Sequence, residues 1–112
     1  MAQNIEKHLK ECKDQINLNK SLQRLYKNRD FKAVVVEQFL KKEAVRCVTA
    51  KAMRAMQPKE LQESLDKRIT AIGEFSEFLR AIPMLASLAE QDIREAEELP
   101  ELEDGDEYEV ED

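Results

Sequence analysis

Residues that form tight turns are scarce in this sequence, and their scarcity limits the folds open to it. The 112 residues include two glycines and three prolines, whereas glycine alone averages about 7% of residues in proteins. Few tight turns can be built from so few residues of these types. The sequence therefore predicts an all-α fold, in which a few long helices are joined by short connections.

Apolar residues recur at helical spacing in the segments between these breaks. The most regular stripe advances by three or four residues at each step: Leu61, Leu65, Ile69, Ile72, Phe75, Leu79 and Ile82. We predict helices at about 5–27, 31–56, 59–82 and 84–98, all within one helical domain of residues 1–98. Pro83 either kinks the third helix or separates it from a fourth, and we favour a break after which the pattern continues.

The central helix, at residues 30–56, is the segment on which the other helices are expected to pack. A wheel of 3.6 residues per turn gathers eight of its apolar residues in one broad sector: Phe31, Val34, Val35, Val45, Val48, Ala52, Met53 and Met56. A strand at 33–36 has three β-branched residues in its favour, but no alternation follows them. We predict that Phe31, Val35 and Val45 are buried between helices and that Lys41 is not. If that face is bare in the monomer, it is the binding site.

The connections between the helices indicate how they pack. The short link Asn28–Asp30 can cap the next helix and turn the chain back, so helices 5–27 and 31–56 should form an antiparallel hairpin. Pro58 ends the central helix and starts a third. Gly73 inside that third helix indicates either the close approach of a neighbouring helix or a hinge. These features together predict a hairpin plus a third, kinked or split helix, in a three- to four-helix bundle.

Charge is distributed unevenly along the chain, whose net charge is −6. Residues 1–60 carry fourteen Lys and Arg against seven Asp and Glu, whereas residues 61–112 carry four against seventeen. Residues 99–112 are predicted to form a disordered acidic tail, because they bury too little apolar area to offset the entropy of ordering. Its acidic residues are Glu101, Glu103, Asp104, Asp106, Glu107, Glu109, Glu111 and Asp112. The tail is interpreted as a solubilising appendage, as a mimic of nucleic acid, or as a screen for the basic half.

The sequence also bears on the compartment of the protein. Two cysteines are few for a secreted disulfide scaffold, and residues 1–10 contain no apolar run typical of a signal peptide. No stretch approaches the roughly 20 consecutive apolar residues of a membrane-spanning helix. We therefore expect a cytoplasmic protein that does not bind membranes.

No stretch of the sequence carries recognisable catalytic chemistry. His8 and Cys12 are four residues apart on one helix face and could share a metal with Cys47, but a closed zinc site needs four ligands. The alternative interpretation is a buried thiol next to a half-exposed histidine. His8 is the only histidine, and no glycine-rich phosphate motif occurs. The sequence predicts no enzyme, no catalytic residue, no cofactor, no metal and no small-molecule substrate.

The basic first half is a candidate nucleic-acid surface. Its Lys and Arg side chains would attract phosphates. Acidic residues are interspersed among them, however, and no aromatic residues suggest a platform for stacking bases. A charged solvent face is therefore favoured over nucleic-acid binding.

Several short motifs lie between residues 20 and 82. They are Leu22-Gln23-Arg24-Leu25, Asn28-Arg29-Asp30-Phe31, Phe39-Leu40-Lys41-Lys42-Glu43-Ala44-Val45-Arg46, Ala71-Ile72-Gly73 and Phe78-Leu79. This pattern resembles that of small helical, acidic-tailed proteins of tailed bacteriophages. The resemblance implies a place among virion or head-assembly genes, with the protein in the host cytoplasm or in the virion. It assigns no role to any single residue.

These observations predict a non-enzymatic, scaffold-like structural or interaction protein that acts through helix–helix contacts. Its partner is expected to be another protein, further copies of itself, or both. The apolar residues predicted to make these contacts are Phe31, Val35, Phe39, Val45, Leu61, Leu65, Ile72 and Leu79. The alternative is a small regulatory or inhibitory protein that acts by charge. It would use either the acidic tail as a nucleic-acid mimic or the basic hairpin as a nucleic-acid contact.

Overall fold

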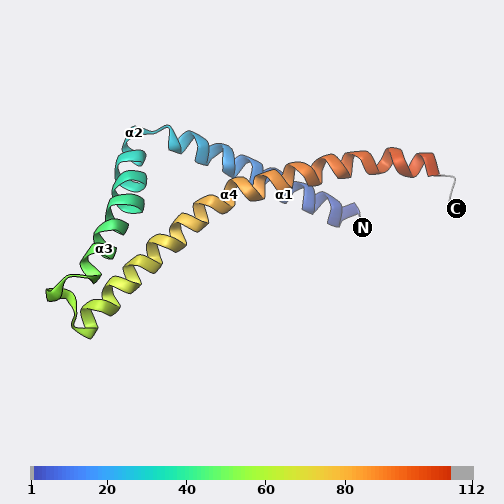
Figure 1. Ribbon diagram of the computed structural model, residues 1–112. Helices are drawn as coiled ribbons and strands as arrows, with labels where there is room; N and C mark the ends of the chain where they lie inside the picture. Colours follow the sequence, from blue (N-terminus) through green and yellow to red (C-terminus); the bar gives the residue numbers. More distant parts are fainter. Residues whose placement is uncertain (1, 107–112) are drawn as a thin grey trace. The chain divides into compact units, whose positions relative to one another are not determined.

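The computed structural model describes the backbone of residues 2–106 and the side chains of residues 3–98. Within this part of the chain every regular element is helical and no strand occurs, so the all-α prediction is confirmed. The elements in order are α1 (Ala2–Tyr26), α2 (Arg29–Phe31), η1 (Lys32–Glu43), α3 (Ala44–Lys51), η2 (Arg54–Met56) and α4 (Lys59–Asp106) (Figure 1). The segment η1 is π-helical, whereas η2 is a single 3-10 turn.

The chain forms two compact units. Unit 1 comprises Met1–Ser21 and Ile82–Asp112, and unit 2 comprises Leu22–Ala81. Each unit pairs a segment of α4 with a segment from earlier in the chain. An antiparallel hairpin was predicted between helices 5–27 and 31–56, whereas the pairings described within the units are made with α4.

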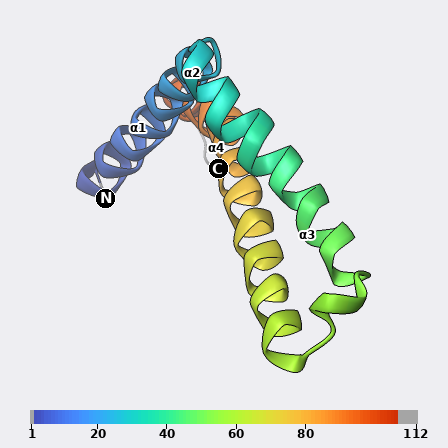
Figure 2. The ribbon, with the colours of Figure 1, turned by 90° about the vertical axis from the view of Figure 1, so that its left-hand side faces the viewer.

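In unit 2, η1 and α3 run antiparallel to the first part of α4. Phe39 on η1 meets Phe75, with ring centroids 6.1 Å apart, whereas Lys51 at the end of α3 pairs with Asp66. Because partners on α4 move to lower numbers as the residue number rises, the two segments are antiparallel. Figure 2 shows them side by side, with η1 and α3 in cyan to green and α4 in yellow.

A capped turn joins α1 to the helical segment that follows it. The Asn28 side-chain oxygen accepts a hydrogen bond from the backbone N–H of Phe31 at 2.9 Å, and Asn28 itself has extended backbone angles. This is the geometry of an N-cap, which satisfies one of the free N–H groups at a helix start. The Tyr26 and Phe31 rings pack edge to face across the turn at 5.8 Å. The predicted connection and cap are therefore confirmed.

The π-helical segment changes which residues face inward. A π-helix bonds residue i to residue i+5, so each turn holds more residues than the 3.6 of an α-helix. Residues four apart can therefore stay on one face over several turns, and Phe31, Val35, Phe39 and Glu43 are all partly buried.

This change explains an error in the predicted core. Lys41 is exposed, as predicted, whereas Phe31 and Val35 are partly and not fully buried. The prediction that Val45 is buried is wrong, because Val45 is 65% exposed. The helical wheel assumed 3.6 residues per turn between Phe31 and Val45, whereas residues 32–43 are π-helical and have more residues per turn. The wheel therefore gave the wrong direction for Val45. The inward residues of α3 are Cys47 and Ala50.

The central helical segment ends at Lys51 and not at Met56, where the sequence placed its end. Two side-chain amides bind carbonyl groups at and just after this end. The Gln57 Nε2 donates to the carbonyls of Lys51 and Met53 at 2.9 and 2.8 Å, and the Gln62 Nε2 donates to those of Lys51 and Met56 at 3.2 and 2.8 Å. These bonds take the place of the intrahelical partners that the last carbonyls of a helix lack.

In unit 1, the first part of α1 runs antiparallel to the second part of α4. Cys12 is buried, and so are Ile82, Ala86 and Ala89, which recur on α4 at intervals of four and three residues. Two of these four side chains are those of alanines. The backbones of the two helices can therefore lie close together, and little aliphatic volume is needed to fill the space between them.

Two predictions about residues inside α4 need correction. The break predicted at Pro83 is absent, since α4 is continuous through it. Proline removes one backbone N–H donor, and buried neighbours such as Ile82 and Ala86 hold the helix on both sides. The close approach predicted at Gly73 is wrong as well, because a Cβ added there would meet no atom within 4 Å. The hinge interpretation of Gly73 stays a prediction.

The start of the predicted acidic tail continues the last helix. The backbone of residues 99–106 belongs to α4, and residues 107–112 lie outside the described part of the chain. In the part of the chain that was searched, no helix combines the length and the apolar character needed to cross a membrane.

Candidate functional site

The hairpin of unit 2 contains the most tightly connected polar group of the described residues, the carboxylate of Glu43. The Arg46 guanidinium binds it with two hydrogen bonds, Nε to Oε1 at 2.9 Å and Nη2 to Oε2 at 2.7 Å. Arg68 on α4 donates from Nη1 to Oε2 at 3.0 Å. Paired, charge-assisted bonds of this kind are stronger and more directional than ordinary hydrogen bonds. Glu43 therefore joins the end of η1 to α4.

The chemistry of Glu43 is that of a structural clamp. Its side chain is 16% exposed, and the hydrogen bond from Arg46, with the positive charges of Arg46 and Arg68, lowers its pKa to about 2. Both carboxylate oxygens already accept hydrogen bonds. A carboxylate that stays ionised at neutral pH and has both oxygens occupied is poorly suited to general acid–base catalysis.

A small apolar core lies next to this clamp. Cys47, Ala50 and Leu65 are buried together, and Met56 and Ile69 pack against them. Cys47 is fully buried, and its sulfur lies 3.8 Å from the Glu43 carboxylate and 3.8 Å from the Arg46 guanidinium. The clamp and the core hold α3 on α4 and leave its opposite face free.

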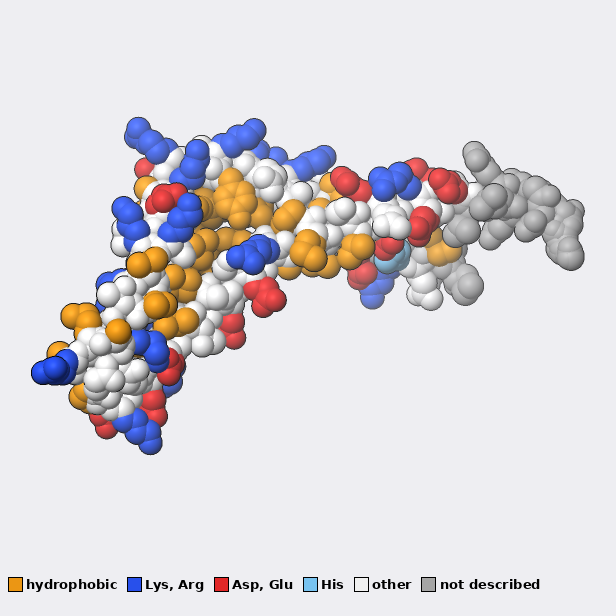
Figure 3. Space-filling model, viewed as in Figure 1, with side chains coloured by type: hydrophobic (Ala, Val, Ile, Leu, Met, Phe, Trp, Pro, Cys, Tyr) orange, Lys and Arg blue, Asp and Glu red, His pale blue; other side chains and the backbone are white. Residues whose placement is uncertain are grey.

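That opposite face of α3 is apolar and bare. Val45 is 65% exposed and Val48 is 60% exposed, and they are neighbours at a spacing of three residues. Met53, just after the helix, is 53% exposed, and Figure 3 shows hydrophobic side chains at the outer tip of this hairpin. We call Val45, Val48 and Met53 the outer α3 face. The sequence wheel grouped these three residues but placed them against the core.

The residues predicted to bind a partner fall into two groups. Leu65, Ile72 and Leu79 are buried within the chain, and Phe31, Val35 and Phe39 are partly buried. Only Val45 and Leu61, the latter 39% exposed, have large exposed areas. The side chains of the predicted acidic tail, from Glu101 to Asp112, lie outside the part of the chain whose side chains are described. The exposed residues therefore favour Val45 as a contact residue, together with the rest of the outer α3 face, which the sequence did not single out for binding.

Several basic side chains proposed for nucleic-acid contact have acidic neighbours. Lys41 pairs with Glu37 at 3.3 Å, and Lys10 pairs with Asp14 at 3.2 Å. Arg46 is bound to Glu43, as described above. Each neighbouring carboxylate offsets part of the positive potential that would attract phosphates. No base-stacking aromatic platform was found among these residues in the sequence.

Two of the three residues considered as metal ligands, His8 and Cys12, lie in unit 1 next to Asp92 of α4. His8 Nε2 is 3.2 Å from Asp92 Oδ2 and 3.6 Å from Cys12 Sγ. Burial raises the pKa of the Cys12 thiol, and the charges of Asp92 and Glu11 raise it further. The sequence named His8 and Cys12 but could not indicate Asp92, because 84 residues separate it from His8. Cys47, the third ligand considered from the sequence, belongs to the core of unit 2.

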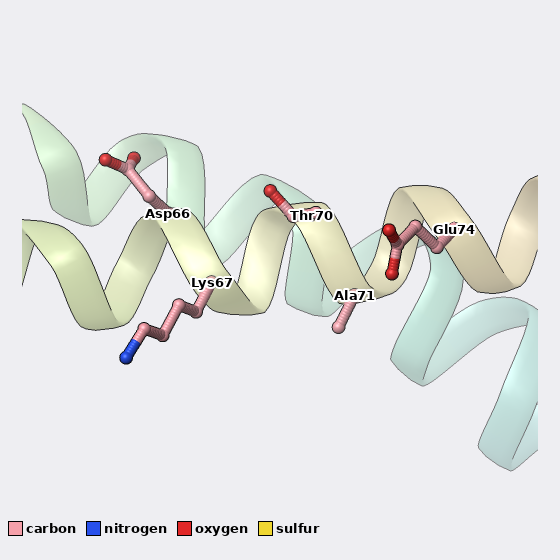
Figure 4. Close-up of a pocket in the computed structure, with 5 residues that line it drawn as sticks. All are labelled: Asp66, Lys67, Thr70, Ala71 and Glu74. Atoms are coloured by element: carbon pink, nitrogen blue, oxygen red, sulfur yellow. The ribbon is translucent and has the colours of Figure 1, made fainter.

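A surface hollow on α4 offers no comparable chemistry. Its volume is about 270 Å³, and its lining residues are Asp66, Lys67, Thr70, Ala71 and Glu74. All five belong to one helix, and Figure 4 shows that their side chains do not converge on a single point. Catalytic sites usually bring together groups that hydrogen-bond one another around a reacting atom. We therefore assign this hollow no function.

Comparison of the chain with protein-family models, with curated proteins and with solved structures finds no match.

Proposed function

We propose that this protein is a non-enzymatic interaction protein whose outer α3 face binds an apolar helix of another protein molecule. The observation that carries the proposal is the exposure of Val45, Val48 and Met53, at 65%, 60% and 53%. Val45 and Val48 lie on one side of α3, which the clamp and the core support from the other side, and Met53 follows the end of the helix. Apolar patches on otherwise charged surfaces often mark protein–protein contacts.

The rest of unit 2 supports the outer α3 face. Glu43 binds Arg46 of α3 and Arg68 of α4. Cys47 and Ala50, on the inward side of α3, form a core with Leu65 of α4. A face that is already ordered loses less conformational entropy on binding than a flexible one. The structure of the hairpin is thus compatible with binding in the manner of an additional packed helix.

The apolar area that a partner could bury on the outer α3 face limits the strength of this contact. Fully burying a Val or Met side chain contributes about 1.5–3 kcal/mol, and these three are 53–65% exposed. Together they would contribute roughly 3–5 kcal/mol before the entropy costs of association. These three residues alone would give weak, concentration-dependent binding, so a stable complex needs further contacts.

The charges around the outer α3 face indicate the kind of partner. Lys42 and Arg54 are exposed at its edges, and Arg46 is 59% exposed although it pairs with Glu43. Complementary charges at the rim of an interface favour correct encounters. The partner proposed here is a helix with an apolar stripe and acidic residues beside it.

The experiment compares the self-association and partner binding of two variants. In Val45→Lys/Val48→Lys a charge replaces each valine of the outer α3 face. Val34→Lys is the control, because Val34 is 64% exposed but lies on η1. Analytical ultracentrifugation across a wide concentration range, with pull-downs from the native source, should show association for the wild type and for Val34→Lys but not for the double variant. A strictly monomeric wild type that co-purifies with no protein would contradict the proposal.

The more specific proposal places the partner among the head-assembly or virion proteins of a tailed bacteriophage. It is supported by the resemblance of residues 20–82 described above. Neighbouring genes provide the test, since a portal, capsid or terminase gene beside this one would support it. A neighbourhood of unrelated cellular genes would count against it, without affecting the proposal for the outer α3 face.

A further inference from the structure

We propose that His8, Cys12 and Asp92 in unit 1 form a binding site for a zinc ion that joins α1 to α4. The donor atoms of the three side chains all lie within 4.8 Å of one another. His8 and Cys12 occupy consecutive turns on one face of α1, and Asp92 approaches from α4. The inference is independent of the outer α3 face, which lies in the other unit.

The distances are close to those that a zinc ion requires. With Zn–S bonds of about 2.3 Å and Zn–N or Zn–O bonds of about 2.0–2.1 Å, tetrahedral ligand atoms are roughly 3.3–3.6 Å apart. The His8 Nε2 to Asp92 Oδ2 distance is 3.2 Å, and the Cys12 Sγ to His8 Nε2 distance is 3.6 Å. The third pair, Cys12 Sγ and the Asp92 carboxylate oxygen, lies within 4.8 Å, and side-chain rotation would bring it to the spacing of tetrahedral ligands.

The types of donor atom favour zinc over the common alkaline-earth ions. A thiolate sulfur, an imidazole nitrogen and a carboxylate oxygen are all established zinc ligands. Calcium and magnesium prefer sites made of oxygen atoms, so a cysteine and a histidine would be poor ligands for them. The donor set therefore points to a borderline-soft divalent cation such as zinc.

The surroundings offer room for a fourth ligand. The three residues line a surface hollow of about 300 Å³, which Glu11 and Gln15 also line. The Gln15 side-chain oxygen is buried, and it has no hydrogen-bond partner among the described residues. Buried polar atoms normally have a partner. A metal-bound water in the hollow, or the Glu11 carboxylate, could fill the fourth position.

A simpler arrangement makes a different prediction. His8 and Asp92 could form only an ion pair, with Cys12 packed beside them as an ordinary buried thiol. Exposed ion pairs contribute little to stability, and such a pair would give Cys12 no part in metal binding. The role of Cys12 therefore separates the two arrangements.

The experiment uses the full chain, freed of metal with a chelator and titrated with Zn²⁺ and, separately, with Co²⁺. One equivalent of Zn²⁺ should bind and raise the melting temperature, because a metal that binds only the folded state stabilises it. Co²⁺ should give an absorption band from sulfur-to-cobalt charge transfer. Cys12→Ser should abolish this band, and His8→Gln and Asp92→Asn should each weaken Zn²⁺ binding by at least about 10- to 100-fold, the loss caused by changing even a residue that only hydrogen-bonds a metal ligand.

Matched controls separate this site from other thiols and carboxylates. Cys47→Ala removes the other cysteine, and Asp14→Asn removes an exposed acid of α1; both should keep the affinity for Zn²⁺ and the cobalt band. His8 and Asp92 have partly exposed side chains, at 55% and 46%, so their variants should fold, as circular dichroism would verify. Zn²⁺ binding that is unchanged in His8→Gln and Asp92→Asn, or the absence of one-equivalent binding in the wild type, would overturn the proposal.

Discussion

The two units pair helices of this chain in different ways. In unit 2 the paired segments are neighbours in sequence, and a small apolar core around Leu65, an aromatic contact and the Glu43 clamp hold them together. In unit 1 the paired segments come from opposite ends of the chain, and the buried side chains include Ala86 and Ala89. Closing a longer loop costs more chain entropy. The comparison indicates that unit 2 is the more stable unit and that unit 1 opens first.

The largest expected effect comes from truncating the core of unit 2. Leu65 is 5% exposed and packs with Cys47 and Ala50, so Leu65→Ala should lower the free energy of unfolding by about 2–5 kcal/mol. Urea denaturation followed by circular dichroism measures this change. Leu61→Ala, at a position 39% exposed, is the control and should cost much less. Equal effects of the two substitutions would refute this description of the core.

A smaller effect is expected from overfilling the contact of unit 1. Ala86 is 3% exposed, and Ala86→Leu should destabilise by about 1–3 kcal/mol, because a close-packed contact has no room for three more carbon atoms. Hydrogen exchange should become faster for residues 5–16 and stay slow for residues 60–75. Faster exchange in both segments would show that the two units unfold as one.

The Glu43 clamp should make the stability of unit 2 depend on pH. Because the pKa of Glu43 is lowered to about 2 in the folded state, its stabilising effect is complete above the unfolded pKa of about 4.3. It is lost as the pH falls from there through 2. In Glu43→Gln the loss of stability between pH 4.5 and 2 should be shallower than in the wild type. Denaturant midpoints across this range measure it, and identical slopes would contradict the clamp.

The smallest expected effect concerns Gly73 in α4. A Cβ at this position meets no atom within 4 Å, so Gly73→Ala should stabilise the protein by about 0.5–1 kcal/mol, as expected for a helix interior. Thermal melting checks this prediction. A decrease in stability would instead support a role for glycine at this position that its surroundings do not show, such as the hinge.

The sequence predicted the parts of the fold that depend on local interactions. The scarcity of glycine and proline predicted the helical class, and Asn28 predicted the cap between α1 and the next helix. The apolar stripe of the third helix included Leu65, Ile72 and Leu79, which are all buried. Spacing identified these three residues because this part of α4 is a regular α-helix, in which every turn has the same number of residues.

The inward face of the central segment and the site in unit 1 depended on tertiary structure. A π-helical segment changes the rotation between Phe31 and Val45, and sequence periodicity assumes a constant pitch. Asp92 joins His8 and Cys12 only because α4 brings it back to α1 across 84 residues, and spacing along one helix carries no signal of such a meeting. By itself the sequence determined which segments are helices, because helix formation follows local spacing and capping. Only the three-dimensional structure showed that Val45 faces outward and that Asp92 lies beside Cys12, because the first depends on the π-helical pitch of residues 32–43 and the second on a contact across 84 residues.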